Sequence, residues 1–200
     1  MDTIQLIFLG IVQGLTEFLP ISSSAHLVLI SKILAWPDQG LLLDVAAHAG
    51  SLVAVLVYFR LQLWQMAIAC CNPSVSKNSA ELRLLGHLFV ATLPIVIVAL
   101  FAATWIERYT RDPSIIATTT IVFALLLGYA AISARELRDE YQLSLGAVLL
   151  IGCAQVLALI PGTSRAGITL TAALLLGQQR SAAARFSLLL SIPTIFAAVV

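Results

Sequence analysis

Long apolar stretches separated by short charged connections run through this chain. Residues 84–105 and 115–133 are each long enough to cross a bilayer, which takes about 20 apolar residues in a helix. Residues 41–59 have the same length but include Asp44 and His48. The connections between such stretches, among them residues 107–114, are short and charged, so we expect loops there. The pattern predicts an all-α, multi-pass membrane protein.

Two further apolar stretches are interrupted by polar, helix-breaking residues. Residues 4–36 break at Pro20, and residues 143–177 break at Pro161. Residues 4–19 before the first break, and the apolar runs 27–36 and 168–177 after the breaks, are too short to cross a bilayer alone. Each stretch predicts a helix, a polar turn and a half-helix. Backbone without helical hydrogen bonds is tolerated at membrane depth only where it is buried in protein or lines a wet cavity. We therefore expect both breaks to be re-entrant and to face something polar.

The two breaks resemble each other, because the same residue types recur in the same order: Gly10, Gln13, Pro20 and Ser23 in the first, and Gly152, Gln155, Pro161 and Ser164 in the second. Aligning them on the prolines requires a gap of one residue. Interrupted segments in corresponding positions of a weak repeat indicate an inverted-repeat fold with its site between the halves. The predicted fold is an all-α polytopic membrane helix bundle with two re-entrant helix-turn-helix segments in inverted repeat, in a single integral membrane domain over residues 1–200.

Composition supports the membrane assignment and excludes other classes. The chain is 60% hydrophobic and 10% charged, whereas soluble domains carry about 25% charged residues. A net charge of +1 gives no basic surface for nucleic acid, so no nucleic-acid partner is expected. Cys70, Cys71 and Cys153 lack metal-ligand spacing and are expected to be buried hydrophobes.

The first break places a carboxylate in an apolar setting. Gln13 and Glu17 are four residues apart and share one helix face. Because a carboxylate at a helix centre in lipid costs about 2.5 to 3.5 kcal/mol on insertion scales, Glu17 needs a cation or a proton. Three chemistries remain open for the following serines and His26. A serine activated by His26 or Glu17 attacks phosphorus, His26 attacks directly, or water attacks while His26 protonates the leaving group.

The second break, residues 161–169, predicts a phosphate cradle. Glycine and small hydroxyl residues at a helix start leave N–H groups for an anion, and Arg165 adds a charged fork that matches phosphate oxygens. Arg165 is also the natural counter-charge for Glu17, so a purely structural ion pair is the alternative. For Asp44 and His48, again four residues apart, the alternatives are lining the site, binding a cation, or simple packing.

Residues 13–26 and 161–169, in order and spacing, resemble the bacterial undecaprenyl-diphosphatase family of the bacitracin-resistance type. The resemblance implies dephosphorylation of undecaprenyl diphosphate to undecaprenyl phosphate, which recycles the lipid carrier of peptidoglycan synthesis. It also implies a divalent cation, Mg²⁺ or Ca²⁺, a polyprenyl diphosphate lipid substrate within membrane lipid, and location in the bacterial plasma or inner membrane. Self-association into a homo-oligomer is a further expectation.

Residue roles follow from the same resemblance. It implies catalytic roles for Glu17, Ser23, His26 and Arg165, substrate binding by Ser22, Gly162, Thr163, Ser164, Arg165 and Thr169, and metal binding by Gln13 and Glu17.

Two positions depart from the family pattern: Gln13 stands where many relatives carry Glu, and Ala166 stands where a second serine is common. The sequence also stops within an apolar block, so we expect it to be truncated at the C-terminus. Two other functions compete with the phosphatase. A transporter or flippase of a polyprenyl phosphate lipid needs the same re-entrant repeats and anion site, and an inactive membrane fragment would need no chemistry.

Overall fold

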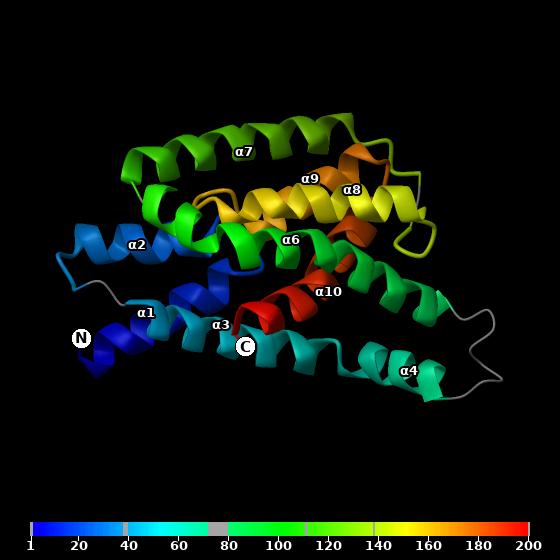
Figure 1. Ribbon diagram of the computed structural model, residues 1–200, viewed down its shortest axis with the longest axis horizontal. Helices are drawn as coiled ribbons and strands as arrows, with labels where there is room; N and C mark the ends of the chain where they lie inside the picture. The colour runs from blue at the N-terminus through cyan, green and yellow to red at the C-terminus, as the bar shows by residue number, and fades with distance from the viewer. Residues whose placement is uncertain (1, 38–39, 72–79, 111, 138, 200) are drawn as a thin grey trace.

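The computed structural model describes residues 2–37, 40–71, 80–110, 112–137 and 139–199, and these form helices joined by short turns (Figure 1). The elements are α1 (Thr3–Thr16), α2 (Ser23–Ile33), α3 (Gly40–Tyr58), α4 (Arg60–Cys71), α6 (Ala80–Thr110), α7 (Pro113–Ser133), α8 (Leu145–Gln155), the 3₁₀ turn η1 (Val156–Leu159), α9 (Arg165–Leu175) and α10 (Arg180–Val199). The described residues contain no strand, which confirms the all-α prediction.

Within the described ranges, three helices are long and apolar enough to cross a membrane, over Ala80–Ala102, Pro113–Ser133 and Arg180–Val199. The consecutive helices α3 and α4 add a fourth span if the pair, bent by 74°, counts as one. These helices confirm a polytopic membrane bundle and the spans predicted at 84–105 and 115–133.

The connection between α6 and α7 is shorter than the predicted loop at 107–114. Helix α6 continues to Thr110, and α7 starts at Pro113. Asp112 caps α7, because its Oδ1 accepts a hydrogen bond from the Ser114 N–H at 2.8 Å, and proline is well suited to the first helical position. The charged residues that suggested a loop therefore end one helix and cap the next.

Both interrupted stretches break where the sequence predicts, and the half-helices after the breaks begin alike. Ser22 and Ser164 each have a φ of 62° and precede an 11-residue helix. The hydroxyl of each serine accepts a hydrogen bond from the N–H three residues later, Ala25 or Gly167. Alignment on these caps pairs Ser22, rather than Ser23, with Ser164 and needs no gap. The inverted orientation and membrane re-entry of the two segments stay predictions.

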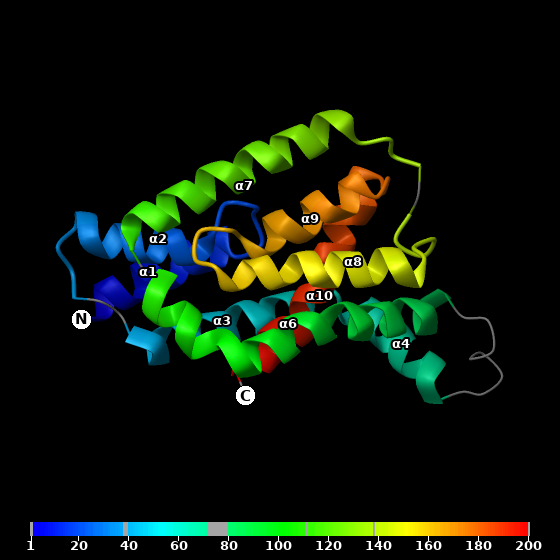
Figure 2. The same cartoon turned by 45° about the horizontal axis from the view of Figure 1, so that its top comes forward.

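The best-packed part of the bundle lies where α6, α8, α9 and α10 meet, with Leu84, Ile151 and Phe186 fully buried. Helices α6 and α8 approach closely because Gly152 has no side chain: a Cβ there would lie 2.6 Å from the Ala91 carbonyl oxygen. Helix α7 runs along one edge of the bundle, packed on α9 (Figures 1 and 2).

The prediction that the cysteines are buried is wrong, since Cys70, Cys71 and Cys153 are all exposed in the structure. Lipid tails are as apolar as a protein core, so the lipid-facing surface of a membrane protein carries the same residue types as its interior. Ile132, 89% exposed on the apolar helix α7, illustrates this. Hydrophobicity alone therefore does not separate buried positions from lipid-facing ones.

Candidate active site

The two breaks meet in space, as predicted. In Figure 2 the connection between α1 and α2 and the turn between η1 and α9 lie side by side. Arg165 Nη2, at the start of α9, donates a hydrogen bond of 2.9 Å to Glu17 Oε1, just after α1. Only 12% of the Arg165 side chain and 5% of the Glu17 side chain are exposed. Each charge therefore has its counter-charge within a largely dry environment.

The Glu17 carboxylate is the centre of the hydrogen-bond network. Its Oε2 accepts from Ser23 Oγ at 2.6 Å and from Gln13 Nε2 at 3.0 Å. Gln13 reaches it because residues four apart share a helix face, as predicted. Helix α1 ends at Thr16 and α2 starts at Ser23, so the chain reverses within a few residues and returns Ser23 to Glu17.

A cavity of about 200 Å³ opens beside this network. Its lining combines polar side chains from the two breaks, α3 and α10 with apolar side chains from α6, α10, η1 and the residue after η1: Glu17, Ser22, Ser23, Ser24, His48, Ile95, Ala158, Ile160, Ser164, Arg165, Thr194, Ile195 and Ala198. The cavity therefore presents hydroxyls, a carboxylate and a guanidinium together with hydrocarbon side chains.

Ser22 and Ser164 both line this cavity and have the same backbone φ of 62°. Both are non-glycine residues with positive φ, a conformation that costs about 1 to 2 kcal/mol for an L-residue. Such strain is concentrated at functional sites, where the surroundings enforce it. The positive φ of each serine turns the chain sharply into the following helix. The first turns of α2 and α9 therefore begin at the cavity, and these turns are the positive ends of the helix dipoles.

The second turn is fastened to α7 by two threonines. Thr119 Oγ1 donates to the Pro161 carbonyl oxygen at 2.7 Å, and Thr120 Oγ1 donates to the Gly162 carbonyl oxygen at 3.1 Å. Gly162 has a φ of 94°, and a Cβ there would lie 2.3 Å from Thr119 Oγ1. Sequence reasoning missed both threonines, because a hydroxyl in an apolar span usually bonds to its own helix.

Five predicted site residues lie outside the cavity lining: Gln13, His26, Gly162, Thr163 and Thr169. His26 Nδ1 is 2.8 Å from the Ser22 carbonyl oxygen, so the ring braces the first turn. Thr169 Oγ1 donates to the Arg165 carbonyl oxygen at 2.9 Å and is 2.6 Å from Ser187 Oγ. Thr163 is 1% exposed, and its hydroxyl has no hydrogen-bond partner among the described residues. These side chains are placed to support the two turns around the cavity.

His48 of α3 is part of the site, whereas the sequence alone left the role of this residue open. Its Nε2 lies 3.5 Å from Glu17 Oε2, and its ring lines the cavity. Its Nδ1 is 2.7 Å from the Asp44 carbonyl oxygen. The four-residue spacing of Asp44 and His48 was the available signal, and it reflects a ring bonded to the backbone one turn earlier.

The donor set at Glu17 fits a divalent cation held by few protein ligands. Gln13 Oε1 is buried and has no hydrogen-bond partner among the described residues, although the amide lies against the Glu17 carboxylate. A cation there would pair this oxygen. The described chain has no cluster of three or more His, Cys, Asp and Glu side chains that could hold a metal alone. Mg²⁺ commonly binds through one or two carboxylates together with water and substrate phosphates, and Glu17 is the carboxylate beside Gln13 here.

Comparison with known proteins shows which family this chain matches. The family model described as bacitracin resistance protein BacA matches residues 6–200. An undecaprenyl-diphosphatase of Alteromonas mediterranea is 50% identical over 199 residues, covering 99% of this chain and 75% of that protein.

Proposed function

The chain belongs to the BacA bacitracin-resistance family, and we propose that its polar cavity is where it removes the terminal phosphate of undecaprenyl diphosphate. The products are undecaprenyl phosphate, which re-enters cell-wall synthesis, and inorganic phosphate. The observation that carries the proposal is the contact between Glu17 and Arg165, because it brings a base and a phosphate-binding group to one cavity.

Arg165 binds the diphosphate. Its guanidinium lines the cavity and offers several N–H donors in a planar fork that matches phosphate oxygens. Ser164 stands beside it, and α9 begins there, so its dipole favours an anion at the same place. The threonine contacts from α7 hold the turn, which keeps this anion site in position before substrate arrives.

Ser23 is the nucleophile that this geometry favours over His26. Its hydroxyl already donates to Glu17 Oε2 at 2.6 Å, the arrangement in which a carboxylate acts as general base. Ser23 Oγ attacks the terminal phosphorus while its proton passes to Glu17. The bond from that phosphorus to the bridging oxygen breaks, and the lipid phosphate leaves. Water then attacks the phosphorus of the phosphoserine, and the bond from that phosphorus to Ser23 Oγ breaks. Ser23 Oγ takes up the proton held by Glu17, and inorganic phosphate leaves.

Gln13 and Glu17 would hold the divalent cation, Mg²⁺ or Ca²⁺. When bound, such a cation neutralises phosphate charge that builds up during transfer. Gln13 Nε2 meanwhile keeps the Glu17 carboxylate oriented, and the unpaired Gln13 Oε1 gains a ligand.

The first units of the prenyl tail would enter a second, apolar cavity of about 240 Å³. This cavity adjoins the polar one, since both are lined by Ile95, Thr194 and Ala198. Its other lining residues are apolar: Val96, Ala99, Leu100, Leu159 and Ala197. The diphosphate head of the substrate would therefore face the polar cavity, and its hydrocarbon tail would enter the adjoining apolar cavity.

The apolar helices and the family place the protein across a membrane, and we extend this to the bacterial plasma membrane, where the lipid carrier is used. Self-association of the chain stays a prediction.

Phosphate release by purified protein in liposomes tests the function. Wild-type protein with Mg²⁺ should release inorganic phosphate from a polyprenyl diphosphate, and Glu17→Gln should not. Movement of the lipid between leaflets without phosphate release would instead support the transporter or flippase.

A further inference from the structure

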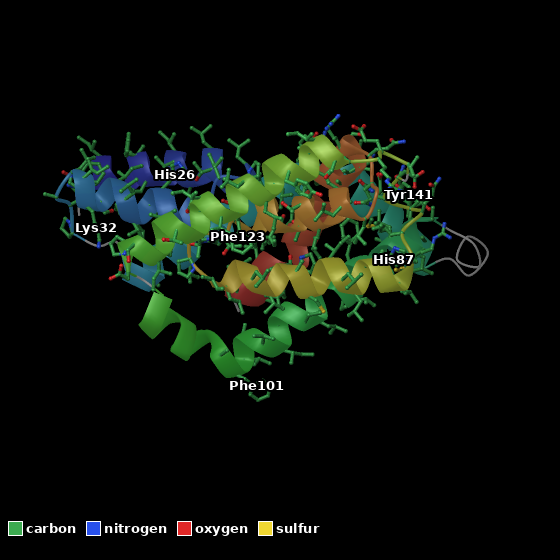
Figure 3. All side chains as sticks on the ribbon, turned by 90° about the horizontal axis from the view of Figure 1, so that it is seen from above. His26, Lys32, His87, Phe101, Phe123 and Tyr141 are labelled. Atoms are coloured by element: carbon green, nitrogen blue, oxygen red, sulfur yellow. The ribbon has the colours of Figure 1, made fainter. Side chains whose placement is uncertain are left out.

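The bend between α3 and α4 and the start of α10 together line a further cavity of about 560 Å³, here called the bend cavity. Tyr58 in its lining follows His48 of the polar cavity by ten positions on α3, which is about 15 Å along a helix. Tyr141 accepts a hydrogen bond from the lining residue Gln62, and Figure 3 shows Tyr141 toward the opposite end of the molecule from His26. The bend cavity is therefore separate from the proposed active site.

Arg185 carries the charge of the bend cavity, and buried neighbours fix its orientation. It is the one charged side chain among the described residues that line this cavity. Its Nε and Nη2 donate to Gln62 Oε1 at 3.2 and 2.8 Å, and its Nε lies 3.4 Å from Glu140 Oε1. Gln62 and Glu140 are both buried. Arg185 Nη1 makes no hydrogen bond to the described residues, and 48% of the side chain is exposed, so part of the planar fork is available to a ligand.

The other polar groups of the bend cavity are hydrogen-bond donors that suit an anion. Gln65 contributes an amide and Ser181 a hydroxyl. Helix α10 begins at Arg180, so its first N–H groups and the positive end of its dipole lie beside Ser181. Together with Arg185 these donors surround one space, which a phosphate group would fill.

The outer edge of the bend cavity is apolar and has the residue types of a membrane interface. Tyr58 and Leu61 line the cavity and are 74% and 71% exposed, and Trp64, next to Gln65, is 67% exposed. Tyrosine and tryptophan are enriched where membrane meets water, at the level of the lipid headgroups. A ligand with a phosphate and an apolar tail therefore matches the cavity better than a free ion.

Glu140 favours one class of lipid phosphate over another. Its carboxylate already offsets the charge of Arg185, so a ligand with a second negative charge would find no further counter-charge there. A phosphomonoester carries a charge of about −1.5 to −2 at pH 7, whereas the phosphodiester of a phospholipid carries a single negative charge. The pair of Arg185 and Glu140 thus suits a phospholipid better than a polyprenyl phosphate.

We propose that the bend cavity binds the headgroup of an anionic membrane phospholipid, whose phosphodiester bonds to Arg185 and whose acyl chains lie against Tyr58 and Leu61. Bound lipid would join α4 to the start of α10. The site needs no turnover and shares no residue with the polar cavity, so it is independent of the proposed phosphatase function.

Native mass spectrometry of the purified protein in detergent, titrated with phosphatidylglycerol, tests the site by giving a Kd for bound lipid. Arg185→Gln alone would leave the buried Glu140 unpaired, so the variant combines it with Glu140→Gln. This double variant should raise the Kd about 10- to 100-fold, the loss of one hydrogen bond to a charged group. Arg180→Gln combined with Glu136→Gln is the matched control, because that neighbouring ion pair lies outside the cavity lining. The control should bind as wild type does.

A second variant leaves the charges in place. Ala184 lines the bend cavity and is half-buried, so Ala184→Phe should fill the space and raise the Kd for phosphatidylglycerol at least about 10-fold. Ala124→Phe, at an exposed position of α7, is its control.

Wild-type protein should bind phosphatidylglycerol more tightly than phosphatidylcholine with the same acyl chains, because only the first has a net negative charge. Equal Kd values for the two lipids, or a Kd that neither the charge variant nor Ala184→Phe raises above its control, would overturn the proposal. Displacement of phosphatidylglycerol by an equal or lower concentration of polyprenyl phosphate would also overturn it, since the site would then belong to the carrier lipid.

Discussion

Arg165 Nη2 and Glu17 Oε1 are 2.9 Å apart, although 148 positions separate the two residues in the chain. The contact joins the start of one half-helix to the end of a helix in the other part of the molecule. Neither break forms the proposed site alone, because we assign the base and nucleophile to the first break and the anion-binding group to the second. Substitutions in either break should therefore affect the same reaction step.

Arg165→Lys should lower kcat/KM about 10- to 100-fold, because lysine keeps the charge but loses the planar fork, and hydrogen bonds to charged groups contribute about 1.5 to 3 kcal/mol. Steady-state phosphate release at several substrate concentrations measures this. Arg180→Lys is the matched control, since Arg180 bonds to Glu136 and to the Ala131 carbonyl oxygen away from the cavity. Equal activity of wild type and Arg165→Lys would exclude Arg165 as the diphosphate clamp.

Ser23→Ala should reduce turnover at least about 10³-fold, because removing a nucleophile removes the main reaction route. Rapid quenching of wild-type protein during turnover, followed by mass spectrometry, should find phosphate on the peptide containing Ser23. Ser133→Ala, at the exposed end of α7, should behave as wild type. Phosphate on His26, or turnover without any phosphorylated residue, would contradict the serine mechanism.

Thr119→Val should destabilise the protein by about 1 to 3 kcal/mol, because the partly buried Pro161 carbonyl oxygen loses its donor. It should also weaken substrate binding, since the anion turn is no longer fastened to α7. Thr119→Ser keeps the hydroxyl and should restore both properties. Unfolding curves and KM measure the effects, with Thr118→Val as control, because the Thr118 hydroxyl bonds within its own helix. The same loss in both valine variants would argue against a specific role for the turn contact.

Gly162→Ala and Gly177→Ala separate backbone strain from close contact. Both glycines have positive φ, at 94° and 85°, so alanine costs about 1 to 2 kcal/mol at either position. At Gly162 the new Cβ would also lie 2.3 Å from Thr119 Oγ1, whereas at Gly177 nothing lies within 4 Å. Gly162→Ala should therefore lose about 1 to 3 kcal/mol more stability in chemical unfolding, the usual cost of overpacking. Similar losses at the two glycines would show that the turn does not press on α7.

The sequence predicted the helices and both breaks, because apolar length and the prolines are local signals. It also predicted the meeting of Glu17 and Arg165, since each buried charge needs a counter-charge. For His48 the sequence did not decide between lining the site, binding a cation and simple packing. It did not predict the contacts of Thr119 and Thr120, because these depend on which helices become neighbours. The cysteines were misassigned for a related reason, since lipid-facing and buried positions have the same composition.

A double-mutant cycle on Glu17 and Arg165 tests the central claim most directly. The unfolding free energies of Glu17→Gln, Arg165→Gln and the double variant are compared with that of wild type. Each single variant leaves a buried charge unpaired and should cost about 3 to 5 kcal/mol. The double variant should cost clearly less than the sum, with a coupling free energy of about 1 to 3 kcal/mol. A coupling free energy near zero would show that the two breaks do not meet and would contradict the account.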